Sequence, residues 1–218
     1  MGFMGRIWVW LEERAGDFWQ QARGLLAGDG ILAIPTDTYY ALAVHPFKEK
    51  GLIRLLAIKQ RAPEKPILLL VATQEMVPQV ARQVPEVARR LMAQFWPGPL
   101  TIILPARPEL PRLVTGGTGT VGVRQPRQPV TCGLLTQMHL PLTGTSANRA
   151  GQPALIRAEE VAQQFGEEVD LILDAGPCPG GQPSTVVDVT CIPPRLVRTG
   201  GTPTNRLLEI VPELNLKA

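Results

Sequence analysis

Short apolar segments that end at glycine or proline alternate with amphipathic helical patterns along almost the whole chain. This alternation restricts the fold most, because interleaved strands and helices assemble into layered α/β or mixed α+β domains. The patterns predict helices at residues 14–27, 47–59, 84–95, 130–138, 158–165 and 203–210. They predict strands at residues 31–34, 67–72, 100–104, 120–124, 140–143, 171–173, 185–189 and 195–198.

The chain of 218 residues contains no long linker, charge block or low-complexity stretch. We therefore predict a single domain over residues 1–218, with a motif-bearing core at about residues 15–210. The longest strongly apolar run, Ile67–Ala72, is far too short to cross a bilayer. Tryptophan and glutamate residues within positions 8–13 interrupt the apolar stretch that a signal peptide requires. These features predict a protein that is not inserted in a membrane.

The formal net charge of +3 is too small to indicate a nucleic-acid-binding protein by itself. Most of the 22 basic residues are arginines, which suit bidentate contacts with phosphate or carboxylate groups. The three cysteines and two histidines have no spacing typical of a metal site, and no CxxC pair occurs. We therefore predict free thiols, no metal site built by the protein and a reducing, cytoplasmic location.

Four segments place hydroxyl side chains or basic residues in Gly- and Pro-rich loops where predicted strands or helices end. They are residues 35–40, 59–66, 143–148 and 183–188, and Arg124 and Arg198 end two further strands. Any one of these segments is equally typical of an ordinary turn or a solvated helix end. Taken together they favour a ligand site, because loops at strand ends converge at one edge of a sheet. Hydroxyl groups and several cations there would suit a polyanion such as a nucleoside triphosphate.

Two common phosphate-binding motifs are excluded. Residues 117–122 match GxGxxG, but a predicted strand that ends before Pro126 follows them, where a dinucleotide-binding motif needs a helix. No glycine precedes a lysine anywhere, so a Walker-type loop is absent from the sequence. The setting of His139 between Met138 and Leu140 favours a partly buried structural residue over a catalytic base.

The ordered set of segments resembles the YrdC/Sua5 family, the threonylcarbamoyl-AMP synthases of tRNA modification. The matching residues are 35–42, 59–61, 65–66, 96–101, 121–124, 145–148, 184–188 and 197–198. The resemblance covers nearly the whole chain and implies the short, single-domain type. It implies an α/β (mixed α+β) fold, with a twisted open sheet flanked by helices and a concave basic groove.

The resemblance also implies a reaction. L-Threonine, bicarbonate or CO2, and ATP would form threonylcarbamoyl-AMP and pyrophosphate, with Mg²⁺ held mainly through the phosphates. A partner enzyme complex would then transfer the threonylcarbamoyl group to adenosine at position 37 of tRNA. Contact with tRNA or double-stranded RNA is a further possible property of such a groove.

Residue roles follow from the resemblance position by position. Lys59 and Arg61 match the family's KxR motif, which implies that they hold ATP phosphates and act as the catalytic residues. The further residues implied for ATP are Thr120, Ser146, Asn148 and Arg198. The residues implied for the threonine pocket are Thr36, Arg124 and Ser184.

The chain departs from the family pattern at several positions. Ala41 stands where the family commonly has glycine, Leu70 where longer members have histidine, and Thr199 where proline is usual. Two alternatives to the synthase therefore stay open at this point. One is an RNA-binding module without synthase activity, and the other is a paralogue that adenylates another carbamoylated amine.

Overall fold

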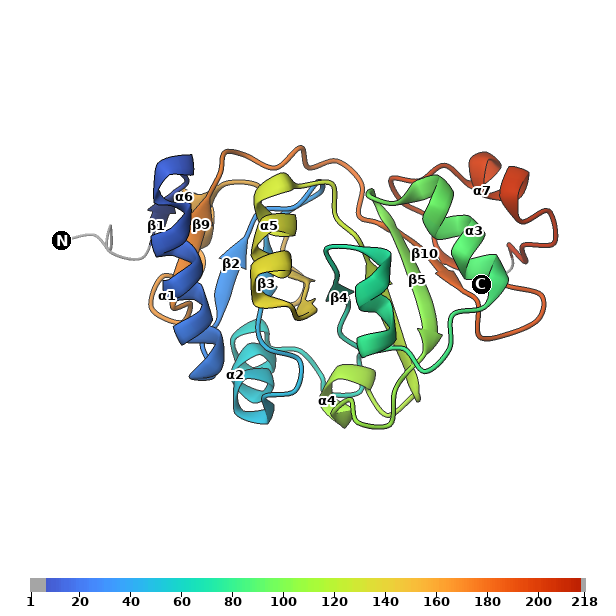
Figure 1. The fold of residues 1–218 in the computed structure, drawn as a ribbon, viewed down its shortest axis with the longest axis horizontal. Coiled ribbons are helices and arrows are strands. Elements are labelled where there is room, and N and C mark those ends of the chain that lie inside the picture. Colours follow the sequence, from blue (N-terminus) through green and yellow to red (C-terminus); the bar gives the residue numbers. More distant parts are fainter. Residues whose placement is uncertain (1–6, 217–218) are drawn as a thin grey trace.

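The computed structural model describes residues 7–216, which form two mixed β-sheets flanked by helices (Figure 1). The mixed α/β class that the sequence predicts is confirmed. The strands divide between sheets of five and six strands, whereas the family resemblance implied one twisted open sheet. Among the described residues, no helix is long and apolar enough to cross a bilayer.

The first sheet has the strand order β1-β9-β2-β3-β8. Its strands are β1 (Ile7–Val9), β9 (Leu171–Asp174), β2 (Leu32–Ile34), β3 (Ala41–Ala43) and β8 (Thr145–Ser146). The first three run parallel, whereas β3 and β8 each pair antiparallel to their neighbours. Helices α1 (Ala15–Ala27) and α5 (Pro129–Met138) contact each other in front of this sheet, and α6 (Ala158–Phe165) contacts β9 (Figure 1).

The second sheet has the strand order β11-β10-β5-β6-β4-β7. Its strands are β11 (Arg195–Arg198), β10 (Thr185–Asp188), β5 (Leu100–Pro105), β6 (Thr120–Arg124), β4 (Leu69–Leu70) and β7 (Leu142–Thr143). Helices α3 (Glu86–Phe95) and α7 (Thr204–Ile210) contact each other at its outer end, and α2 (Glu49–Lys59) contacts α4 (Arg112–Thr115). Two 3₁₀ helices, Glu12–Arg14 and Gln74–Gln79, complete the elements.

The two sheets meet at Gly144. Strand β7 of the second sheet ends at Thr143, and β8 of the first sheet begins at Thr145, so a single residue carries the chain from one sheet to the other. A Cβ atom at position 144 would collide with the side chain of Leu70 in β4. Glycine is therefore required at this crossing, since it lets the backbone approach Leu70 closely.

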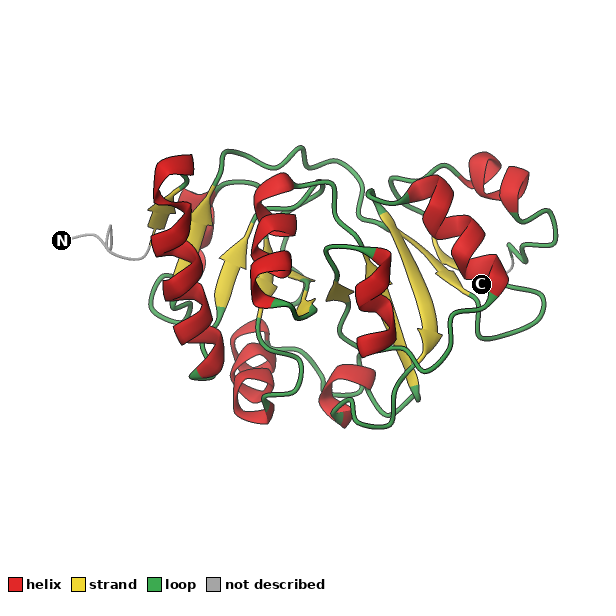
Figure 2. Ribbon diagram, in the orientation of Figure 1, coloured by secondary structure: helices red, strands yellow, loops and turns green. Residues whose placement is uncertain are grey.

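Most predicted elements are present (Figure 2), and the differences concern short segments. Only Leu69–Leu70 of the predicted strand 67–72 pairs as a strand. Strands β1, β3 and β8 and helix α4 were not predicted, because two to four residues are too few for a periodic pattern. His139 was predicted to be partly buried, but it is exposed and ends α5 with a φ of 52°.

The glycine-rich segment before β6 forms turns, as the sequence predicted. Gly117 and Gly119 have φ values of 78° and 71°, in the region that glycine adopts most readily. Strand β6 follows directly, so no helix is available for a dinucleotide-binding motif.

Candidate active site

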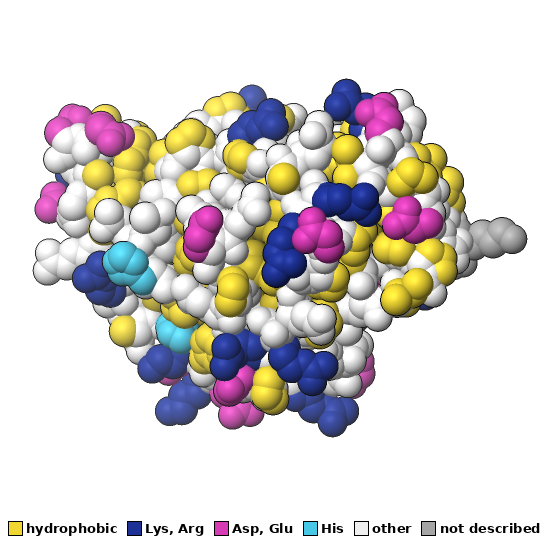
Figure 3. Space-filling view, turned by 45° about the vertical axis from the view of Figure 1, so that its right-hand side comes forward, with side chains coloured by type: hydrophobic (Ala, Val, Ile, Leu, Met, Phe, Trp, Pro, Cys, Tyr) yellow, Lys and Arg dark blue, Asp and Glu magenta, His cyan; other side chains and the backbone are white. Residues whose placement is uncertain are grey.

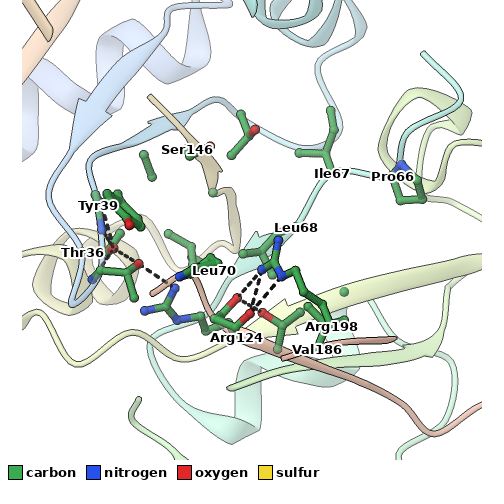
Figure 4. A pocket seen from close by; sticks show the side chains of 18 of the residues that line it. Thr36, Tyr39, Pro66, Ile67, Leu68, Leu70, Arg124, Ser146, Val186 and Arg198 are labelled. Atoms are coloured by element: carbon green, nitrogen blue, oxygen red, sulfur yellow. Dashed lines mark hydrogen bonds between the residues drawn. The ribbon is translucent and has the colours of Figure 1, made fainter. Parts of the chain in front are cut away.

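A cavity of about 410 Å³ lies between the two sheets. The first sheet contributes Ala41 and Ser146, and the second contributes Gly122 and Arg124 among others. The charged residues among its lining are Arg61, Arg124 and Arg198, and no described acidic residue lines it. In Figure 4, Thr36 and Tyr39 lie on one side and Arg198 and Val186 on the other, with Leu70 and Arg124 between them.

Alternation along the strands explains how the second sheet presents polar groups to the cavity. Thr120, Gly122 and Arg124 are two residues apart in β6 and therefore share one face. The same rule places Thr101 and Ile103 of β5 on the cavity side. Apolar residues at the intervening positions are buried in the core.

Arg124 is buried and held on three sides. Its Nε donates to the Gly98 carbonyl at 3.1 Å, Nη1 donates to Thr38 Oγ1 at 3.2 Å, and Nη2 forms an ion pair with Asp37 at 2.5 Å. Burial lowers the pKa of the guanidinium, and the Asp37 carboxylate acts in the opposite direction. An arginine has five N–H groups, so two remain for a ligand in the cavity.

Thr36 organises the loop that contains Asp37 and Thr38, two of the partners of Arg124. Its hydroxyl accepts hydrogen bonds from the backbone N–H groups of Thr38 and Tyr39 and donates to the Tyr39 carbonyl at 2.7 Å. The Thr36 and Thr38 hydroxyl oxygens are 3.0 Å apart. This turn holds Thr38 against Arg124 and places Thr36 in the cavity wall.

Lys59, the last residue of α2, is directed at the loop that follows β8. Its Nζ donates to the carbonyls of Ser146 and Asn148 and lies 3.3 Å from Asn148 Oδ1. The side chain is buried, and burial together with the charge of Arg61 lowers the pKa of Lys59 to about 8. Ser146 Oγ donates to Asn148 Oδ1 at 2.6 Å. Lys59 and Asn148 thus fix the loop that presents Ser146 to the cavity.

Arg61 and Arg198 are more accessible than Arg124. Arg61 donates from Nη2 to the Pro66 carbonyl at 2.8 Å. Arg198 donates from Nε and Nη2 to the Ser184 carbonyl at 3.1 and 2.8 Å. Burial lowers the pKa of both guanidinium groups, and arginine nevertheless stays charged at neutral pH. Each keeps an Nη1 group without a protein acceptor among the described residues.

The cavity gathers most of the residues that the sequence singled out. Those that line it are Thr36, Arg61, Thr120, Arg124, Ser146, Ser184 and Arg198. Lys59 and Asn148 do not line it but support the Ser146 loop. Ala41 lies in strand β3 with a negative φ, so its backbone needs no glycine there.

Sequence reasoning missed two members of the site. Asp37 was not linked to Arg124, because the pairing joins residues 87 positions apart. Thr101 belongs to the matching segment 96–101 but was given no role, although an isolated hydroxyl in an otherwise apolar strand was an available signal. Among residues 7–216, no group of three His, Cys, Asp or Glu side chains is placed to hold a metal ion.

Sequence comparison identifies relatives of this chain. A threonylcarbamoyl-AMP synthase of Pyrococcus abyssi is 34% identical over 195 residues, which are 89% of this chain and 57% of the relative. The chain thus spans little more than half of that longer protein. A threonylcarbamoyl-AMP synthase of Idiomarina loihiensis is 34% identical over 174 residues, covering 79% of this chain and 93% of the relative.

Solved structures agree with these relatives. P. abyssi Sua5 complexed with L-threonine superposes with a TM-score of 0.90 at 33% identity, covering 96% of this chain and 62% of that one. E. coli YciO superposes with a TM-score of 0.83 at 27% identity, covering 95% of this chain and 100% of that one. The Sua5/YciO/YrdC family model, described as "Telomere recombination", matches residues 24–200. With the family's sequence pattern over most of its length and the matching fold, the chain belongs to the Sua5/YciO/YrdC family.

Proposed function

We propose that this chain is a threonylcarbamoyl-AMP synthase, a nucleotidyltransferase that joins L-threonine, bicarbonate or CO2, and ATP and releases pyrophosphate. The observation that carries the proposal is a cavity in which Arg61, Arg124 and Arg198 converge from three separate segments without an acidic neighbour in the lining. Such a site favours ligands with several negative charges, and ATP, a carbamate and an amino-acid carboxylate are all anionic. The names of the relatives support the same activity.

Within this function we assign two groups of residues. Thr36, Arg124 and Ser184 form the threonine pocket, where the free N–H groups of Arg124 can pair with the carboxylate. The ATP contacts are Arg61, Thr120, Ser146 and Arg198, with Lys59 and Asn148 holding the Ser146 loop. We propose that ATP enters as its Mg²⁺ complex, with the metal held through phosphate oxygens and water.

The proposed chemistry takes its nucleophile from the substrate. The neutral amine of threonine adds to CO2 and releases one proton to solvent, which gives a carbamate. A carbamate oxygen then attacks the α-phosphorus of ATP, and the bond from the α-phosphorus to its bridging oxygen breaks as pyrophosphate leaves. The protein aligns these groups and neutralises the charge that develops on the phosphates. Arginines that are already oriented by carbonyl acceptors suit this role, because they need little reorganisation during the reaction.

The product is an activated acyl donor, which a partner enzyme complex would use to modify adenosine 37 of tRNA. We place the protein in the cytoplasm for that reason and regard residues 1–218 as one domain. Direct contact with tRNA is not needed for the synthesis itself.

The test supplies labelled bicarbonate, ATP, Mg²⁺ and one amino acid at a time, and follows labelled adenylate and pyrophosphate. We expect label in a nucleotide adduct with L-threonine, and no adduct without ATP. An adduct formed with a different amine would instead identify a paralogous activity. Absence of any adduct, combined with tight, salt-sensitive RNA binding that is independent of ATP, would favour an RNA-binding module.

A further inference from the structure

Thr101 is the one hydroxyl residue in strand β5, whose sequence Leu100–Pro105 is otherwise apolar. Its side chain is only 4% exposed although it faces the cavity. A buried hydroxyl without a partner is costly, so such a residue normally has a defined hydrogen bond. Here the partner is Ser184, with 2.8 Å between the two hydroxyl oxygens.

Ser184 connects this hydroxyl to Arg198. Arg198 Nη2 donates both to the Ser184 carbonyl at 2.8 Å and to Ser184 Oγ at 3.1 Å, and Nε adds a bond to the same carbonyl. Strands β5, β10 and β11 are neighbours in the sheet, so the contacts run across three adjacent segments. Because arginine only donates, the Ser184 oxygen must act as acceptor toward Arg198.

The hydrogen-bonding protons of Thr101, Ser184 and Arg198 give Thr101 a specific role. When Thr101 donates to Ser184 Oγ, that oxygen accepts two hydrogen bonds, and the proton of Ser184 is free to point at a ligand. Without the Thr101 hydroxyl, Ser184 Oγ loses one of the two partners that fix its rotamer and keeps only the bond from Arg198. One of the three bonds that orient the Arg198 guanidinium then weakens.

We propose that Thr101 is a positioning residue that orients Arg198 through Ser184, and thereby sets the affinity of the site for the nucleotide. The step from Arg198 to the nucleotide rests on the proposed function. The orientation of Arg198 by Thr101 is independent of it.

The variants are Thr101→Val, which removes the hydroxyl at nearly constant shape, and Thr101→Ser, which keeps it. Thr115→Val is the matched control, because Thr115 is also buried and hydrogen-bonded but does not line the cavity. Ligand-free, ¹⁵N-labelled protein gives the direct readout, which is the Nε–H signal of Arg198. An Arg198→Lys variant identifies that signal.

We expect a sharp Arg198 Nε–H signal in wild type, Thr101→Ser and Thr115→Val. The signal should be broader in Thr101→Val, where the bond to Ser184 Oγ is weakened and the two bonds to the Ser184 carbonyl remain. By calorimetry, Thr101→Val should raise the Kd for ATP about three- to tenfold, the effect of losing one hydrogen bond. Thr101→Ser and Thr115→Val should bind ATP like wild type.

An Arg198 signal in Thr101→Val as sharp as in wild type would overturn the role of Thr101. Equal weakening of ATP binding by Thr115→Val would also overturn it, since the effect would then follow stability and not position. A wild-type chain that binds no ATP would contradict the proposed function, and the Arg198 signal would still decide whether Thr101 orients that residue.

Discussion

The three arginines of the cavity differ in how many of their N–H groups the protein already uses. Arg124 is buried and bonded to a carbonyl, a hydroxyl and a carboxylate, so it is a rigid part of the wall. Arg61 and Arg198 bond mainly to carbonyls and keep Nη1 available. The sequence predicted these residues as site members because they stand at or just after the end of a regular element and match the family pattern. It did not predict their partners, which are close in sequence for Arg61 but distant for Arg124.

Arg61→Ala tests whether the available arginines carry the function. In the proposed function Arg61 binds the ATP phosphates, so removing its charge should lower kcat/KM for ATP by about 100-fold or more, with little change in stability. Pyrophosphate release is the measurement. Arg206→Ala is the control, because Arg206 forms only an exposed ion pair with Glu209 and should react like wild type. Near-normal pyrophosphate release by Arg61→Ala would contradict the assignment.

The lowered pKa of Lys59 predicts how kcat/KM for ATP depends on pH. Its pKa is lowered to about 8, chiefly by burial, and three oxygen atoms face its Nζ. Above that pH the neutral amine has two protons for three acceptors, so one oxygen faces a lone pair. The Ser146 loop should loosen, and kcat/KM for ATP should fall as the pH rises through about 8.

Lys59→Arg separates this titration from others in the reaction. The guanidinium stays charged at alkaline pH, so this variant should have lower activity, because its geometry differs, but no decline near pH 8. The same alkaline decline in wild type and Lys59→Arg would assign the titration to another group.

At the scale of elements, every helix of seven or more residues and every strand of four or more was predicted, whereas strands of two or three residues were missed or predicted too long. The helix of residues 158–165 and the strand of residues 120–124 were predicted with the observed bounds, because their polar and apolar positions follow a clear period. Only Leu69–Leu70 of the strand predicted at 67–72 has strand geometry. Ile67 and Leu68 line the cavity there, and the Ile67 N–H donates to the Val114 carbonyl outside the ladder.

Strand β6 supplies an element-scale test at Gly122, which lies between Thr120 and Arg124 on the cavity face. A Cβ atom there would lie 3.2 Å from Thr101 Cγ2. Gly122→Ala should therefore place a methyl group in the cavity and weaken binding of threonine or ATP about tenfold. Isothermal calorimetry measures the loss.

The control for Gly122→Ala is Gly24→Ala. Gly24 lies inside helix α1 with nothing within 4 Å of an added Cβ, so alanine should stabilise the protein by about 0.5–1 kcal/mol and leave binding unchanged. Unchanged affinity in Gly122→Ala would mean that ligands do not occupy the space above β6.

At the scale of the whole molecule, the charge that matters for the proposed function is the positive charge of the cavity lining, and the net charge is small. The surface in Figure 3 mixes basic and acidic side chains, consistent with a net charge of only +3, while the charged residues of the cavity lining are all arginines. The sequence predicted layers of helices and sheets. It did not predict two sheets, because the chain passes between them three times, after β3, β7 and β9, and several strands that pair within each sheet are far apart in the sequence.

Since both sheets line the cavity, a bound ligand should stabilise the molecule as one unit. We expect a single thermal unfolding transition by calorimetry. ATP at 100 times its Kd should add about 2.7 kcal/mol of stability. For a chain of this size that is a rise in Tm of about 5–10 °C.

In Arg61→Ala, the same ATP concentration should produce a much smaller rise in Tm. Two separate transitions, of which ATP shifts only one, would show that the sheets unfold independently and that the ligand contacts just one of them.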